Sequence, residues 1–290
     1  MTNRRRFLGG LAAGGLAASG LGVGAKFPFL STASAAASSP SGMQKEVQKN
    51  IIAIGGAGLN WKRDRLLLTR YAFSLSGKKN PRVCLLPTAT GDSLRTIVNY
   101  YEAVNNLICR PEHLRIYSPH VTDFADYLLS FDVIYVGGGN TLNMLAIWRE
   151  QGIVDILREA WEKGIVLLGS SAGSICWFEQ GSTDSRPGRL TAMKCMGFLE
   201  GSNCPHYSSE RARRSTYHRM IKDGRLKNGL AADDGCGLHY QETKLHKVIS
   251  SRPRAMAYSV KKESDYIVET PLQPEYLGDK KSLQTAYIDS

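Results

Sequence analysis

The chain lacks the residue patterns of several common functional classes. Its six cysteines include no C-x-x-C pair, which argues against a zinc site and against a dense disulfide framework. Cys84 and Cys176 lie in apolar runs and are expected to be buried thiols, whereas a Cys195–Cys204 disulfide stays open. Neither G-x-x-x-x-G-K-[ST] nor G-x-G-x-x-G occurs, so the sequence predicts no P-loop and no dinucleotide site. We therefore expect neither a metal nor a cofactor.

One segment near the N-terminus is almost free of polar side chains, but it is short for a membrane span and rich in glycine and alanine. The preceding "RRRFL" (4–8) reads as an arginine pair, any residue, then Phe-Leu, and it resembles a twin-arginine export signal. "ASA" (33–35) fits a small-x-small cleavage site. We predict an export signal at 1–35, recognised by the twin-arginine machinery, a linker at 36–48 and a periplasmic or extracellular mature protein. Retention of the signal as an anchor is the alternative.

Acidic residues are fewer than basic ones, 26 against 37. The predicted signal holds four of the basic residues and no acidic one, so the rest of the chain has 33 basic and 26 acidic residues. The excess of basic residues is modest, and aromatic residues are not interleaved with them. The sequence therefore gives little support to nucleic-acid binding. The sequence leaves the oligomeric state open.

Apolar runs alternate with helical patterns from about residue 49 onward. The expected strands include "NIIAIGG", "RVCLLP", "LRIYSP" (114–119), "DVIYVGGG" and "GIVLLGS", separated by segments with helical spacing. This pattern predicts an α/β fold with a mostly parallel sheet and helices on both faces. After residue 230 the shorter runs "CGLHYQE", "LHKVISS" and "AMAYSVKK" predict an antiparallel edge near the C-terminus. We expect one domain over 49–290.

The stretch "GIVLLGSSAGSICWF" (164–178) places Ser171 in a G-x-S-x-G motif between a strand and a helix. Such a turn presents a serine at the carboxyl end of the sheet, and small flanking residues make room for its strained backbone. The sequence therefore predicts Ser171 as a nucleophile. Backbone N–H groups of Ala172 and of Gly139, in the glycine-rich "VGGGNT", are expected to form an oxyanion hole.

The nucleophile needs a base and an orienting acid. Of the six histidines, we favour His206, in the loop "GSNCPHYSSE", as the base. Asp184 lies between the serine and the histidine in sequence and is our expected acid, with Glu179 as the main alternative and Glu200 and Glu210 as further rivals.

Together, "VGGGNT", "GSSAGSICWF", "TDS", "NCPHYSSE" and "AADDGCGLHY" resemble the peptidase E (aspartyl dipeptidase) family of serine peptidases, whose other branch is cyanophycinase. The resemblance covers about residues 50–260. It implies a fold related to class I glutamine amidotransferases, with Ser171 as nucleophile, His206 as base, and Gly139 and Ala172 as the oxyanion hole. The spacing of the family's acid varies, so the resemblance does not choose between Asp184 and Glu179.

The resemblance also implies a small peptide substrate with aspartate on the acyl side. Arg213 and Arg214 follow His206 closely, and a guanidinium there could grip the aspartate carboxylate in a bidentate way. An exported cyanophycinase-like peptidase and a non-catalytic binding protein are the alternatives. The family's dipeptidases are typically cytoplasmic, so the predicted export signal is a departure.

Overall fold

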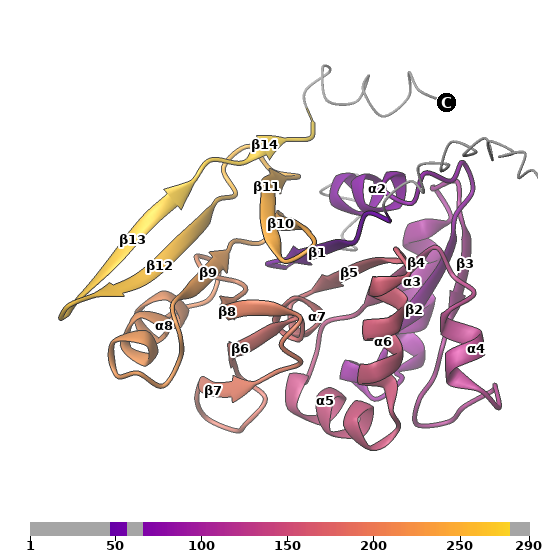
Figure 1. Cartoon of the computed structure of the whole chain (residues 1–290), viewed down its shortest axis with the longest axis horizontal. Helices are drawn as coiled ribbons and strands as arrows, with labels where there is room; N and C mark the ends of the chain where they lie inside the picture. The colour runs from indigo at the N-terminus through magenta and orange to yellow at the C-terminus, as the bar shows by residue number, and fades with distance from the viewer. Residues whose placement is uncertain (1–46, 57–65, 279–290) are drawn as a thin grey trace, which may run out of the picture. The chain divides into compact units, whose positions relative to one another are not determined.

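A computed structural model of the chain describes residues 47–56 and 66–278 (Figure 1). The predicted export signal and most of the predicted linker lie outside the described residues. The strands are β1 (Asn50–Ile54), β2 (Arg82–Leu86), β3 (Arg110–His113), β4 (Val133–Val136), β5 (Val166–Ser170), β6 (Phe178–Thr183), β7 (Thr191–Lys194), β8 (Leu199–Cys204), β9 (Gly229–Ala232), β10 (Cys236–Gln241), β11 (Lys244–Ser250), β12 (Ala257–Glu263), β13 (Tyr266–Leu272) and β14 (Glu275–Tyr276). The helices are α2 (Leu67–Ser74), the 3₁₀ turn η1 (Thr88–Thr90), α3 (Leu94–Val104), α4 (Phe124–Leu128), α5 (Thr141–Glu150), α6 (Ile153–Glu162), α7 (Ala172–Ile175) and α8 (Arg213–Lys222).

The larger sheet has eight strands in the order β14-β11-β10-β1-β5-β4-β2-β3. Strands β1, β5, β4, β2 and β3 run parallel, whereas β10 pairs antiparallel with β1 and β11 pairs antiparallel with β10. The predicted α/β fold with a mostly parallel sheet is confirmed. The predicted antiparallel edge is also confirmed for "CGLHYQE" and "LHKVISS", which form β10 and β11.

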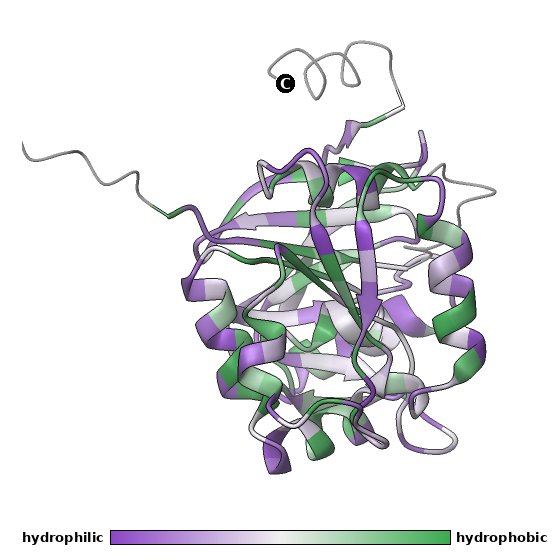
Figure 2. Cartoon of the chain, turned by 90° about the vertical axis from the view of Figure 1, so that its right-hand side faces the viewer, coloured by the Kyte–Doolittle hydropathy of each residue, from purple (hydrophilic) through white to green (hydrophobic). Residues whose placement is uncertain are grey.

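Alternate side chains of the parallel strands pack against different helices. In β1, Ile51 and Ala53 belong to the core shared with α5 and α6, whereas Ile52 and Ile54 belong to the core shared with α2 and α3. Both faces are therefore covered, which explains why these strands are apolar at successive positions instead of alternating. In Figure 2 green strands lie in the middle of the view, and the helices on either side carry both purple and green residues.

The predicted strand at 114–119 is wrong, because the strand at this place is β3 at Arg110–His113. The Leu114 N–H still donates to the Leu85 carbonyl of β2, but the chain then leaves the sheet, and the buried side chains of Leu114 and Ile116 pack into the core from a loop. The backbone N–H of Tyr117 donates to Asp92 Oδ2 at 2.7 Å, where a strand would pair with another strand. β3 itself is polar because it lies at the edge of the sheet.

A second sheet, which the sequence analysis did not foresee, has six strands in the order β13-β12-β9-β8-β6-β7. The run "AMAYSVKK", expected at the edge of the first sheet, forms β12 and pairs with β9 and β13 instead. Within this sheet β6, β8 and β9 are neighbouring parallel strands. The three loops that follow them therefore leave the same edge of the sheet (Figure 1).

All six cysteines lie in the described part of the chain and all are free thiols, so Cys195 and Cys204 do not pair. Cys84 and Cys176 are buried, as expected. Among the described residues, none of the helices is long and apolar enough to cross a membrane.

Candidate active site

Ser171 occupies a sharp turn between β5 and the single-turn helix α7. Its backbone has φ 57° and ψ −111°, a conformation that a non-glycine residue rarely adopts. Its N–H donates to the Ile54 carbonyl of the neighbouring strand β1 at 3.1 Å, and its carbonyl accepts from Ser174 and Ile175. These bonds hold Ser171 in the strained conformation at the carboxyl end of the parallel strands.

The small residues on either side of Ser171 are required by close backbone contacts. A Cβ added at Gly169 would lie 2.0 Å from the Gly173 carbonyl oxygen, and one added at Gly173 would lie 2.2 Å from the Val136 carbonyl oxygen. The first oxygen belongs to α7 and the second to β4, so neither can move without disturbing a helix or a strand. Both glycines of the G-x-S-x-G motif are therefore needed for the turn that exposes the serine.

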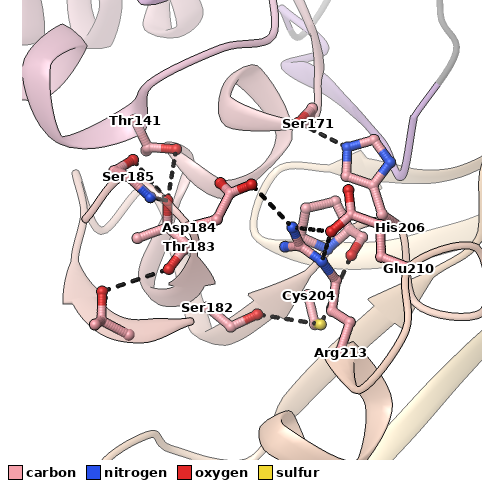
Figure 3. A network of polar contacts seen from close by, with 12 residues as sticks. Thr141, Ser171, Ser182, Thr183, Asp184, Ser185, Cys204, His206, Glu210 and Arg213 are labelled. Carbon is pink, nitrogen blue, oxygen red and sulfur yellow. Dashed lines mark hydrogen bonds and ion pairs between the residues drawn. The ribbon is translucent and has the colours of Figure 1, made fainter. Parts of the chain in front are cut away.

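His206 lies in the loop after β8, directly opposite Ser171. Its Nε2 is 2.8 Å from Ser171 Oγ, with a side chain that is 20% exposed (Figure 3). Its backbone has φ 54°, and its N–H donates to the Gly55 carbonyl after β1. The structure therefore brings the two predicted residues Ser171 and His206 into hydrogen-bond contact across the two sheets.

Asp234, in the loop after β9, holds the other side of the imidazole. Its Oδ1 is 2.6 Å from His206 Nδ1. Burial raises the pKa of Asp234, but the hydrogen bond and charge of His206 together with a hydrogen bond from Ser209 outweigh it, so the pKa is lowered. The carboxylate is therefore ionised at neutral pH and accepts the Nδ1 proton. This leaves Nε2 as the acceptor for the Ser171 hydroxyl.

The expectation that Asp184 or Glu179 partners His206 is not met by this geometry. Asp184 follows β6, on the opposite side of β8 from β9, and its Oδ2 lies 3.6 Å from Arg213 Nη2. Glu179 accepts from Lys227 and from the backbone N–H of Gly201. In the strand order β9-β8-β6, Asp234 follows one neighbour of β8 and Asp184 follows the other. The His206 imidazole is hydrogen-bonded to Asp234, after β9.

The glycines after β1 make room for this histidine–aspartate pair. A Cβ added at Gly56 would lie 2.1 Å from Asp234 Oδ1 and 2.6 Å from the imidazole of His206. The Gly56 carbonyl also accepts from the N–H of Gly235, next to Asp234. The "IGG" at the end of the first strand therefore serves this site, a role that the sequence analysis missed.

The glycine-rich loop after β4 lies against Ser171, as predicted. A Cβ added at Gly138 would be 3.1 Å from Ser171 Cβ and 3.7 Å from its Oγ. Gly139 has φ 138°, which favours glycine, and a Cβ there would be 2.3 Å from the Ala89 carbonyl oxygen. Ala172 is the first residue of α7 and is buried. The backbone of both predicted oxyanion-hole residues thus belongs to segments beside the serine.

The two predicted arginines differ. Arg213 is buried, with a side chain only 2% exposed. Its Nε donates to Glu210 Oε2 at 2.7 Å (Figure 3). Arg214 points elsewhere. It pairs with Glu269 of β13 and lies over the rings of Tyr207 and Tyr258. Arg214 is therefore withdrawn as a candidate for substrate binding, because its charge is already matched by a carboxylate that is only 13% exposed.

Within the described ranges, no group of three or more His, Cys, Asp and Glu side chains is placed to hold a metal ion.

The chain is similar to known peptidases. Residues 51–248 match the model of peptidase family S51. An uncharacterized peptidase of Bacillus subtilis, YgaJ, is 48% identical over 230 residues, which are 79% of this chain and all of the relative.

Two solved structures share the fold. The crystal structure of a peptidase from an acI-B1 actinobacterium has a TM-score of 0.60 at 15% identity, over 81% of this chain and 97% of that one. The structure of a putative peptidase E protein from Listeria monocytogenes has a TM-score of 0.50 at 17% identity, over 78% of this chain and all of that one. The family model and the Bacillus subtilis relative confirm the expected resemblance, and this chain is a peptidase that belongs to family S51.

Proposed function

We propose that the chain is a serine-type peptidase that cleaves short peptides through an acyl-enzyme. The observation that carries this proposal is the continuous hydrogen-bonded row from Ser171 through His206 to Asp234, with distances of 2.8 and 2.6 Å. In such a row the imidazole can take the serine proton while the carboxylate fixes its tautomer and stabilises the imidazolium.

The proposed reaction has two halves. Ser171 Oγ attacks the carbonyl carbon of the substrate as the hydroxyl proton passes to His206 Nε2. The developing oxyanion accepts hydrogen bonds from the backbone N–H groups of Gly139 and Ala172. The C–N bond then breaks and Nε2–H gives its proton to the leaving amine. Water next attacks the ester at Ser171 with His206 again as base, which releases the acid and restores the serine.

For substrate choice, we propose that Arg213 binds an aspartate side chain on the acyl side. Its tight partner is Glu210, whose Oε2 lies 2.5 Å from Nη2, whereas its contact with Asp184 is loose at 3.6 Å. Asp184 is 68% exposed. A substrate carboxylate can therefore take the place of Asp184 beside the guanidinium without breaking the contact that anchors the arginine. Burial favours this arrangement, since a desolvated guanidinium binds carboxylates strongly.

Offered side by side, Asp-Leu should be cleaved with a kcat/KM about 10²–10⁴-fold higher than Asn-Leu or Ala-Leu. A polar site built for a charged group rejects analogues that leave it unpaired. Steady-state kinetics with the purified chain measures this ratio, with Ser171→Ala protein as the blank. Arg213→Lys should reduce the ratio, because lysine keeps the charge but loses the bidentate geometry.

Three other outcomes separate the alternatives. Equal cleavage of Ala-Leu and Asp-Leu would end the aspartate proposal while leaving a serine peptidase. Cleavage of cyanophycin alone would favour the cyanophycinase-like alternative. Binding of these peptides without any turnover would favour a binding protein.

We also propose that the protein is exported through the predicted twin-arginine signal. Replacing Arg4 and Arg5 by lysine should keep the precursor inside the cell, because the export receptor reads the arginine pair itself and not its charge. Cell fractionation followed by immunoblotting measures this. Arg6→Lys is the matched control, since it changes the variable position of the motif and should be exported normally. Equal export of the Arg4→Lys, Arg5→Lys double variant would point to another route.

A further inference from the structure

The loop that carries Gly139 is held by contacts with two other loops. Residues 137–140 join β4 to α5 and are called the oxyanion loop below. The N–H of Asn140 donates to the Ala89 carbonyl at 2.7 Å, and this is the same oxygen that leaves no room for a Cβ at Gly139. The second set of contacts is with the loop after β6, residues 183–185. Where Gly139 lies is therefore determined partly by loops outside its own segment.

The side-chain amide of Asn140 makes two hydrogen bonds with different roles. Its Oδ1 accepts from the Asn143 N–H at 2.9 Å and so caps α5. Its Nδ2 donates to the Ser185 carbonyl at 3.2 Å. Ser185 Oγ in turn accepts from the Leu142 N–H at 3.2 Å. The first bond belongs to the helix itself, whereas the other two tie the start of α5 to the loop after β6.

The loop after β6 is itself fixed by its hydroxyl groups. Thr183 is buried, and its Oγ1 lies 2.7 Å from Ser185 Oγ and accepts the Ser185 N–H. Thr183 Oγ1 also donates to Thr141 Oγ1 of α5 at 3.4 Å (Figure 3). Between these two anchored residues, the carboxylate of Asp184 points to Arg213, 3.6 Å away (Figure 3). This short loop therefore contacts the start of α5 and also the arginine proposed to bind the substrate aspartate.

The bond between Asn140 and Ser185 also joins the two sheets. The oxyanion loop follows β4 of the larger sheet, whereas Ser185 follows β6 of the second sheet. An oxyanion donor stabilises the transition state only where its N–H is aimed at the developing charge, so a small displacement of the loop weakens catalysis. Loss of this bond would free the oxyanion loop from the loop of Asp184 without touching the nucleophile or the base.

We propose that Asn140 is a positioning residue, whose side chain fixes the oxyanion loop relative to the loop that carries Asp184. This inference rests on the proposed function and extends it from the groups that touch the substrate to one that holds them in place. Asparagine suits the task because its amide has an acceptor for the helix cap and a donor for the Ser185 carbonyl.

The variant Asn140→Ser separates positioning from capping. Serine caps a helix about as well as asparagine, but it has no second polar atom for the Ser185 carbonyl. The kcat for Asp-Leu should fall by about 10–10²-fold, less than for the loss of a whole oxyanion donor, and KM should change by less than about threefold, because the oxyanion forms only in the transition state. Asp123→Ser, which exchanges the capping side chain of α4, is the matched control and should keep both constants.

Labelling of Ser171 with a fluorophosphonate tests the inference without a peptide, because this reaction also builds negative charge on an oxygen beside the serine. Asn140→Ser should be labelled about 10–10²-fold more slowly than the wild type. Calorimetry should show equal affinity for Asp-Leu in Ser171→Ala protein with and without Asn140→Ser.

Ser185→Ala, which removes the bond to the Leu142 N–H and leaves α5 its cap, should also slow the labelling and supplies the test if Asn140→Ser does not fold. Equal labelling rates of the wild type and the folded variant, or a loss of activity that lies entirely in KM, would overturn the inference. In both cases the labelled wild type would leave the serine mechanism standing. A wild-type chain that is never labelled on Ser171 would overturn the proposed function and this inference with it.

Discussion

Ser171→Ala is expected to lower kcat by about 10³-fold or more while the protein folds normally, because the acyl-enzyme cannot form without Oγ. His206→Ala should lose a similar factor, since it leaves the hydroxyl without the base 2.8 Å away. The double variant should be little worse than either single one, as is usual for residues that act as a unit. Steady-state kinetics with circular dichroism as the folding check measures all three.

Two exposed positions supply the controls for these variants. Ser74→Ala on α2 and His120→Ala in the loop after β3 make the same chemical changes away from the site and should keep wild-type kcat. Near-wild-type turnover by a well-folded Ser171→Ala protein would rule out the proposed mechanism.

The second large effect is expected at Asp234. Asp234→Asn should lower kcat by about 10³–10⁴-fold, because an amide donates to Nδ1 where the carboxylate accepts, and the imidazole then presents the wrong tautomer to the serine. Folding should be retained, since asparagine has the same shape and the surrounding loop is held by backbone bonds of Gly235 and Cys236.

Asp184→Asn and Glu179→Gln are the comparisons that decide the identity of the acid. Asp184→Asn should keep kcat within about tenfold and act mainly on KM for aspartyl substrates, through its contact with Arg213. Glu179→Gln should keep both constants, because its carboxylate is bound to Lys227 and Gly201. If Asp184→Asn lost its activity while Asp234→Asn stayed active, then Asp184 would be the acid that orients His206, as the sequence predicted.

The parallel sheet and the serine turn could be predicted because their causes are local. Successive residues of β1 and β5 are apolar because both faces of these strands are buried. The G-x-S-x-G spacing follows from close backbone contacts, of Gly169 with Gly173 and of Gly173 with the adjacent strand β4. His206 could be predicted partly from its loop and partly from the family resemblance. These features are encoded in short stretches of sequence.

The second sheet and Asp234 depend on pairing between distant strands. Order along the chain favoured Asp184, which lies between the serine and the histidine, and nothing in the sequence showed that β9 pairs with β8 opposite to β6. The pairing of Cys204 with Ala231 brings Asp234 next to His206 across 28 residues of sequence. A signal was present in "AADDGCGLHY", where two aspartates follow an apolar strand, but it identified the family without assigning the acid.

The most direct test of the central claim is to label the protein with a fluorophosphonate and to locate the label by peptide mass spectrometry. The account predicts one label, on Ser171, formed rapidly by the wild-type chain, much more slowly by Asp234→Asn, and absent from His206→Ala over the same time. A label on Ser208 or Ser209, or peptide hydrolysis by a wild-type chain whose Ser171 is never labelled, would contradict it.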